Sequence, residues 1–293
     1  MSAHPVAIPP PSRRHRVRET GFRYALLGCL LVSLALLGTL LINVFSDGVG
    51  GLDWDFISNP TSSLPILAGI RGPLFGTLLL MTVCAAFIVP VGVATAVYLE
   101  EYADRDRWWN RLIEVNIQNL AAVPSIVYGI LGLAFLVRGP LNLGRVVLAG
   151  GLTLALLVLP VVIIAGREAI RAVPPSIREG SMALGATRWQ TVWKQILPAA
   201  VPGIATGVIL ALSRAIGETA PLILVATAVD VPADPSGWFS EFTALPLQIF
   251  NWTADPQDDF KALAASAIIV LLAVLLTMNA VAIWLRNRYE QKW

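Results

Sequence analysis

The segment Pro174–Pro198, PPSIREGSMALGATRWQTVWKQILP, carries signals for the start of a helix twice within 25 residues. Ser176 followed by Glu179 is a candidate capping box, in which the serine oxygen accepts a first-turn amide and the glutamate bonds back to the cap amide. Gly185 is suited to end this first helix, because glycine adopts the left-handed backbone conformation without steric cost. The first half of the segment therefore predicts a short helix closed by a glycine turn.

The second half of the segment predicts another helix. Thr187 and Gln190 form a second candidate capping box, and three apolar side chains lie at helical spacing around it, namely Trp189, Trp193 and Ile196. A loop that only joins two membrane spans needs no such helix, turn and helix. A helical hairpin lying on the membrane surface is the alternative that the pattern leaves open.

The composition is that of an integral membrane protein. Hydrophobic residues make up 56% of the 293, charged residues make up 14%, and the mean hydropathy is +0.70. Six stretches are long enough to cross about 30 Å of hydrocarbon as helices of roughly 20 residues. The first is too long for a signal peptide, and no small-residue cleavage pattern follows it. We therefore expect an all-α fold with six transmembrane helices, at 24–45, 74–99, 114–137, 146–165, 201–228 and 262–285.

Basic residues predict the orientation, since cytoplasmic loops carry the excess of Lys and Arg. With the N-terminus inside, the cytoplasmic segments hold 16 of these residues and the outer segments hold 4. We therefore expect both termini in the cytoplasm. Residues 1–23 are rich in Pro and Arg and predict a disordered basic leader that contacts membrane lipid, and residues 286–293 form a short tail. The acidic outer loop, 230–261, either docks an external protein or rests at the membrane interface.

Two charged residues lie inside the predicted fifth span. Arg214 and Glu218 are four residues apart and share one face of a helix. Each costs at least about 2.5–3.5 kcal/mol at mid-bilayer, so both should face protein or water. One interpretation is a mutual salt bridge that locks the helix in the bundle. The other is an oxyanion contact held in place by Glu218, because the guanidinium fork matches phosphate oxygens. Gly217 and Pro221 predict a local break and hinge beside the pair.

Three further residues are candidates for a path through the membrane. The third span contains VPSIVYG at 123–129, where Pro124 removes a helix amide and either Ser125 or Tyr128 lines the path. A kink that serves packing alone explains this segment equally well. Arg167, at the inner end of the fourth span, is either a second anion contact or an ordinary basic residue on the cytoplasmic side.

Several classes of function are excluded by what the chain lacks. The two histidines, His4 and His15, lie in the leader, and the two cysteines, Cys29 and Cys84, lie in apolar stretches. We therefore expect no metal site, no disulfide framework and no catalytic site. The net charge of +2 is too small to suggest binding of nucleic acid.

The Pro174–Pro198 segment resembles the cytoplasmic EAA-type motif of binding-protein-dependent ABC importer permeases. The spacing of Glu179, Gly185 and Leu197-Pro198 matches the motif, whereas Gly180 and Ser181 replace two alanines and Gln195 stands at an isoleucine position. In that family the first short helix is the coupling helix, which inserts into a groove of the ATPase subunit. The resemblance gives this role to Glu179, Met182, Ala183 and Gly185.

The segment Arg214–Leu222, RAIGETAPL, closely resembles a signature of the PstA-type permeases of phosphate ABC importers. This resemblance covers about residues 70–285, including the coupling loop 166–200, and implies a five-helix permease core preceded by the extra helix 24–45. It further implies a multi-pass subunit of the bacterial inner membrane that forms half of a path for inorganic phosphate. The implied partners are a homologous second permease, two cytoplasmic ATPase subunits and an extracytoplasmic phosphate-binding protein.

The positions of the lysines agree with ATP binding on a separate subunit. A phosphate-loop ATP site needs a lysine directly after a glycine, and none of the three lysines follows one. We therefore expect this chain to bind no cofactor and ATP-Mg to bind the partner ATPase subunits.

Other functions stay open at this stage. Arg214 alone does not separate phosphate from sulfate or molybdate. An ion-driven secondary transporter would use Arg214 and Glu218 as a proton relay, although the internal repeat usual in such folds is not visible. An intramembrane enzyme is the weakest alternative, because the spans contain no histidine and no serine or cysteine with a nearby base.

Overall fold

A computed structural model describes residues 13–104, 106–226 and 234–289. Within these ranges the chain is helical, with one isolated β-bridge between Val146 and Glu241. Five helices are long and apolar enough to cross a membrane, and a bent pair of helices makes a sixth crossing when it is counted as one span. The predicted all-α fold with six spans is thereby confirmed.

The helices have the following bounds: α1 Arg13–Gly48, α2 Trp54–Ser58, α3 Arg71–Val97, α4 Trp108–Ala121, α5 Ser125–Leu131, α6 Val147–Arg171, α7 Pro175–Ala183, α8 Arg188–Thr191, α9 Leu197–Gly217, α10 Ala220–Val225, α11 Leu245–Ala254 and α12 Asp258–Tyr289. Short 3-10 turns lie at Val49–Gly51 and Pro65–Leu67, and π-helical turns at Tyr98–Tyr102, Gly132–Val137 and Val192–Ile196.

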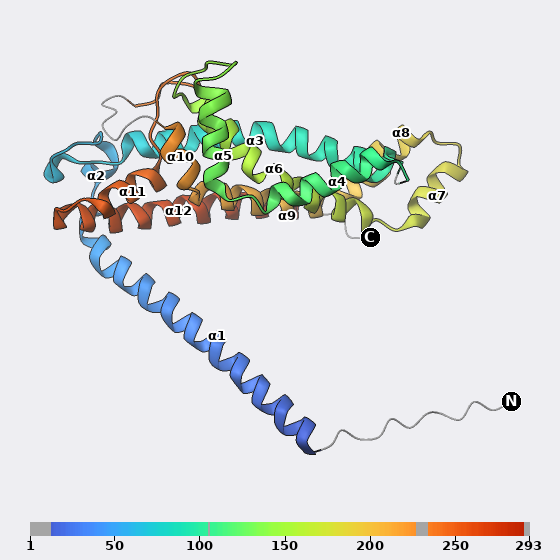
Figure 1. The fold of residues 1–293 in the computed structure, drawn as a ribbon, viewed down its shortest axis with the longest axis horizontal. Coiled ribbons are helices and arrows are strands. Elements are labelled where there is room, and N and C mark those ends of the chain that lie inside the picture. The colour runs from blue at the N-terminus through green and yellow to red at the C-terminus, as the bar shows by residue number, and fades with distance from the viewer. Residues whose placement is uncertain (1–12, 105, 227–233, 290–293) are drawn as a thin grey trace.

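Four long helices, α3, α6, α9 and α12, lie side by side and form the bundle (Figure 1). We call the end that carries α7 and α8 the inner end, and the end that carries α2 and α11 the outer end. Small residues let the helices approach closely. A β-carbon added at Gly92 of α3 would lie 2.7 Å from a methyl of Val162 on α6, and one at Gly207 of α9 would lie 2.4 Å from the β-carbon of Ala165 on α6. The main apolar core fills the space between α3, α6 and α9.

Helix α1 diverges from the bundle and touches it only near its last turn (Figure 1). There Ser266 on α12 donates a hydrogen bond to the carbonyl of Gly48 at 2.8 Å. The predicted disordered leader is wrong in part. Residues 1–12 lie outside the described residues, but 13–23 are helical, because the helix of the apolar span extends into a stretch free of proline.

The predicted third span is not one straight helix. α4 ends at Ala121, α5 begins at Ser125, and the two axes differ in direction by 108°. The bend lies where Pro124 was expected to cause a kink, because proline lacks an amide hydrogen and disfavours helical backbone in the residue before it.

The fifth span also differs from its predicted bounds. One continuous helix runs from Arg188 to Gly217 and α10 follows after a break, while the end of the predicted span at 227–228 lies outside the described residues.

In the outer loop, α11 buries Leu245, Leu247 and Trp252 against the bundle. The amide of Leu245 donates to the hydroxyl of Thr77 on α3 at 2.9 Å. The apolar middle of the outer loop therefore packs on the chain's own helices.

Candidate coupling loop and translocation-path residues

The loop at the inner end has the helix, turn and helix that the sequence predicts. α7 ends at Ala183, and Gly185 adopts the left-handed backbone conformation with φ +84°. At the start of α8, the side chain of Thr187 accepts the amide of Gln190 at 3.3 Å, and the side chain of Gln190 accepts the amide of Thr187 at 2.9 Å. The second capping box is thus confirmed.

The first capping box is wrong. α7 begins at Pro175, the capping residue is Pro174, and the cap makes no side-chain hydrogen bond. Proline has its backbone preset for the first helical position, so the helix starts before Ser176. The serine therefore lies inside the first turn, where it is unable to cap.

The four residues assigned to coupling lie on the exposed side of this loop. Glu179, Met182, Ala183 and Gly185 are all exposed. Leu184, which the sequence reading passed over, is 91% exposed beside them. Three residues of α7 on the other side are half-buried, namely Ile177, Arg178 and Ser181. α7 therefore presents one face away from the bundle and another towards it.

Arg214 and Glu218 meet at the end of α9. The helix ends at Gly217, and Glu218 continues in extended backbone. Arg214 Nε lies 3.1 Å from Glu218 Oε1, and the side chains are 42% and 19% exposed. The ion pair therefore spans the end of the helix, and the Glu218 side chain is more shielded than the Arg214 side chain.

The predicted break lies between Gly217 and Pro221. α9 stops before Glu218, and α10 begins at Ala220 with Pro221 in its first turn. A β-carbon added at Gly129 of α5 would lie 2.7 Å from the α-carbon of Pro221. The two motifs that the sequence singled out, at 123–129 and 214–222, are therefore in direct contact.

Tyr128 and Ser125 belong to this junction. Tyr128 is buried, and its hydroxyl donates to the carbonyl of Leu120, near the end of α4, at 2.8 Å. This hydrogen bond links α5 to α4 across the bend. Ser125 is half-buried at the start of α5.

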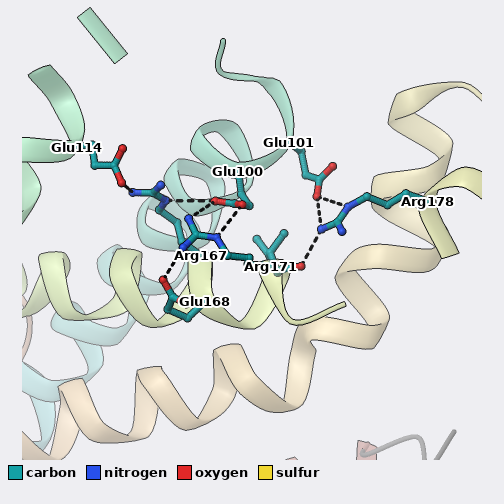
Figure 2. A network of polar contacts seen from close by, with 8 residues as sticks. Glu100, Glu101, Glu114, Arg167, Glu168, Arg171 and Arg178 are labelled. Carbon is teal, nitrogen blue, oxygen red and sulfur yellow. Dashed lines mark hydrogen bonds and ion pairs between the residues drawn. The ribbon is translucent and has the colours of Figure 1, made fainter. Parts of the chain in front are cut away.

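Arg167 lies elsewhere, in a network of charged side chains at the inner end (Figure 2). Its Nη1 is 2.9 Å from Glu114 on α4, and its Nε is 3.6 Å from Glu100. The side chain is only 12% exposed. The structure thus places Arg167 between two carboxylates, away from the Arg214 junction.

The same network holds residues that the sequence reading missed. Glu100 and Glu101 lie in the π-helical turn Tyr98–Tyr102 that extends α3, and their side chains are 4% and 8% exposed. Arg171 contacts Glu100 at 3.0 Å, and Arg178 of α7 contacts Glu101 at 2.8 Å. Two adjacent acidic residues at the predicted cytoplasmic end of a span were the available signal, because the positive-inside pattern does not call for them. Among the described residues, no group of His, Cys, Asp and Glu could hold a metal ion.

Comparison with known proteins identifies the family. Residues 88–293 match the family model described as the binding-protein-dependent transport system inner membrane component. The chain is 33% identical over 276 residues to a probable ABC transporter permease protein, YqgI, of Bacillus subtilis, which covers 88% of this chain and 92% of that protein. It is 36% identical over 219 residues to the phosphate transport system permease protein PstA 1 of Mycobacterium tuberculosis, which covers 74% of this chain and 70% of that protein.

A solved structure has the same fold. A chain in the crystal structure of a bacterial alginate ABC transporter, in complex with an alginate pentasaccharide-bound periplasmic protein, aligns with a TM-score of 0.69 at 17% identity. The alignment covers 92% of this chain and 94% of that one. From the family match and the fold together, this chain is a multi-pass membrane protein that belongs to the inner membrane components of binding-protein-dependent transport systems.

Proposed function

We propose that this chain forms half of the translocation path for inorganic phosphate in an ATP-driven importer. The observation that carries the proposal is Arg214, whose side chain is 42% exposed at an interruption in a membrane-spanning helix. A charge at such a depth is costly and usually marks a path, and the planar donor fork of arginine matches the oxygens of an oxyanion.

We propose different roles for the two charged residues. Among the described residues, the ion pair of Arg214 with Glu218 uses Nε, so the two Nη groups are available to a ligand. A carboxylate would repel phosphate, so we assign Glu218 to hold the guanidinium. Gly217 and Pro221, on either side of the break, are the proposed hinge.

Two other residues complete the proposed path. Ser125 offers a hydroxyl at the start of α5. Tyr128 holds the bend between α4 and α5 through its bond to Leu120. Arg167 does not join them in the proposal, because it lies between Glu100 and Glu114 at the inner end.

The loop at the inner end is the proposed contact with a separate ATPase subunit. Its support is the exposed side of α7 and the turn, which combines Glu179 with the apolar Met182 and Leu184. ATP-Mg then binds and is hydrolysed on two ATPase subunits, and a homologous second permease forms the other half of the path. An extracytoplasmic phosphate-binding protein delivers the cargo, with both termini of this chain in the cytoplasm.

The choice of phosphate rests on the relatives. The guanidinium fork suits sulfate and molybdate as well, but several relatives at 30% to 36% identity are named phosphate transport permeases. An ion-driven transporter finds no support in the family match.

The test of the cargo is uptake of labelled phosphate by bacteria that lack their own phosphate importer and express this chain with its partner subunits. Unlabelled phosphate in excess should abolish uptake, and equal excesses of sulfate or molybdate should leave it unchanged. Inhibition by sulfate or molybdate as strong as that by phosphate would assign the path to another oxyanion.

A further inference from the structure

Arg178 is the charged residue on the half-buried face of α7. Its neighbours Glu179, Met182 and Ala183 lie on the exposed face, where the ATPase contact is proposed. The side chain of Arg178 instead extends from α7 towards the ends of two other helices (Figure 2).

The guanidinium of Arg178 joins three chain segments. Its Nε donates to Glu101 Oε1 at 3.0 Å, in the π-helical turn at the end of α3. Its Nη2 donates to the carbonyl of Ile170 at 2.8 Å, and its Nη1 donates to the carbonyl of Val173 at 2.9 Å. The last carbonyls of a helix lack partners within that helix, so Arg178 caps the end of α6 while it pairs with α3.

The partner carboxylate makes this contact hard to replace. The side chain of Glu101 is 8% exposed, and a shielded carboxylate that loses its cation also loses the compensation for its desolvation. Hydrogen bonds between charged partners are also shorter and stronger than neutral ones. A displacement of α7 should therefore draw α3 and α6 with it.

The other non-covalent contacts of α7 are neutral, and one of them is the packing of Ile177 against the apolar cluster that includes Val192 and Ile196. Towards α8, the hydroxyls of Ser181 and Thr191 lie 3.0 Å apart, and the chain passes through the left-handed turn at Gly185. Beside α7, Ile177 also lines an apolar hollow of about 350 Å³ together with residues of α6 and α9, among them Ala169 and Ala199. This side of α7 thus offers one neutral hydrogen bond and apolar packing, whereas Arg178 forms a charged joint between three chain segments.

We propose that Arg178 is a positioning residue for coupling, which makes α7 move as one body with α3 and α6. Movement of α7 by the ATPase then reaches the membrane through these two helices. They are in turn closely packed, since a β-carbon at Gly92 of α3 would meet Val162 of α6 at 2.7 Å. This inference rests on the proposed function, in which α7 contacts the ATPase.

The test uses the complete transporter reconstituted in vesicles, with phosphate uptake and ATP hydrolysis measured on the same preparation. Arg178→Gln and Glu101→Gln should each lower the phosphate delivered per ATP hydrolysed by roughly tenfold. The double variant should be no worse than the worse single, because both changes break one contact. Arg111→Gln is the matched control, since this exposed arginine on α4 makes no ion pair among the described residues and its change removes the same charge. The control should keep the wild-type ratio.

Two results would overturn the proposal. One is an unchanged ratio in Arg178→Gln, with uptake and hydrolysis falling together as they would for a residue that only aids assembly. The other is a double variant in which the two single effects multiply. If Arg178→Gln fails to assemble, Arg178→Lys replaces it, because lysine keeps the charge but does not span the carboxylate and both carbonyls. A ratio below wild type then supports the proposal, and an unchanged ratio contradicts it.

Failure of the phosphate assignment would look different. Wild-type vesicles would then take up no phosphate. The role of Arg178 in coupling would still be measured by the stimulation of ATP hydrolysis that the external binding protein causes. Arg178→Gln should lose that stimulation while Arg111→Gln keeps it, whichever cargo is carried.

Discussion

Replacing Arg214 with glutamine should lower phosphate uptake sharply while the protein still assembles. The change removes the positive charge from a side chain that is 42% exposed at the break after α9. A hydrogen bond to a charged group contributes about 1.5–3 kcal/mol, and the two Nη groups, which the ion pair with Glu218 does not use, carry more than one donor. A loss of about 2–3 kcal/mol corresponds to a roughly 30- to 150-fold fall in the rate of uptake at limiting phosphate.

Initial rates of labelled phosphate uptake, normalised to the amount of assembled transporter, measure this effect. Arg286→Gln is the control, because Arg286 also contacts α9, through Thr206 at 3.1 Å, and lies outside the proposed path. It should retain near wild-type uptake.

The double variant Arg214→Gln with Glu218→Gln separates a phosphate contact from a structural salt bridge. If the pair only locked the helix, removing both charges would restore uptake, because neither group is left unpaired. The proposed path predicts that uptake stays low. Recovery in the double variant would refute the reasoning.

The remaining predictions concern backbone and packing. Gly185→Val should reduce phosphate delivered per ATP, because φ +84° is strained for a β-branched residue; normal coupling in this variant would count against the loop assignment. Gly129→Val should lower the melting temperature of the purified complex by several degrees, since its β-carbon would lie 2.7 Å from the backbone of Pro221. Gly28→Ala, where no atom lies within 4 Å, should not lower it, and equal losses would contradict the packing argument. Thr187→Ala should destabilise the start of α8 by about 1 kcal/mol, seen as faster amide exchange there; unchanged exchange would argue against the cap.

Local signals in the sequence predicted the parts of the fold that depend on one or two residues. The apolar runs predicted the spans, Gly185 predicted the left-handed turn, and Thr187 with Gln190 predicted the cap of α8. The cap at Ser176 failed because Pro175 begins the helix first. Local pattern alone does not rank two start signals that overlap.

Contacts between distant residues could not be predicted in the same way. Pro124 predicted the place of the bend after α4, but not its angle of 108° or the packing of α5 against α10 through Gly129 and Pro221. The pairing of Arg178 with Glu101 joins residues 77 positions apart. A buried carboxylate needs a cation, but the coupling loop contains five arginines and lysines, and the sequence does not show which of them pairs with Glu101.

The central claim is ATP-driven transport of phosphate by a complex that contains this chain. The most direct measurement is accumulation of labelled phosphate in vesicles that contain the chain and its co-purifying subunits, with ATP supplied on the ATPase side and no ion gradient. The account predicts accumulation that requires hydrolysable ATP and is not reduced by excess sulfate or molybdate. Accumulation that followed an imposed proton gradient without ATP would contradict it.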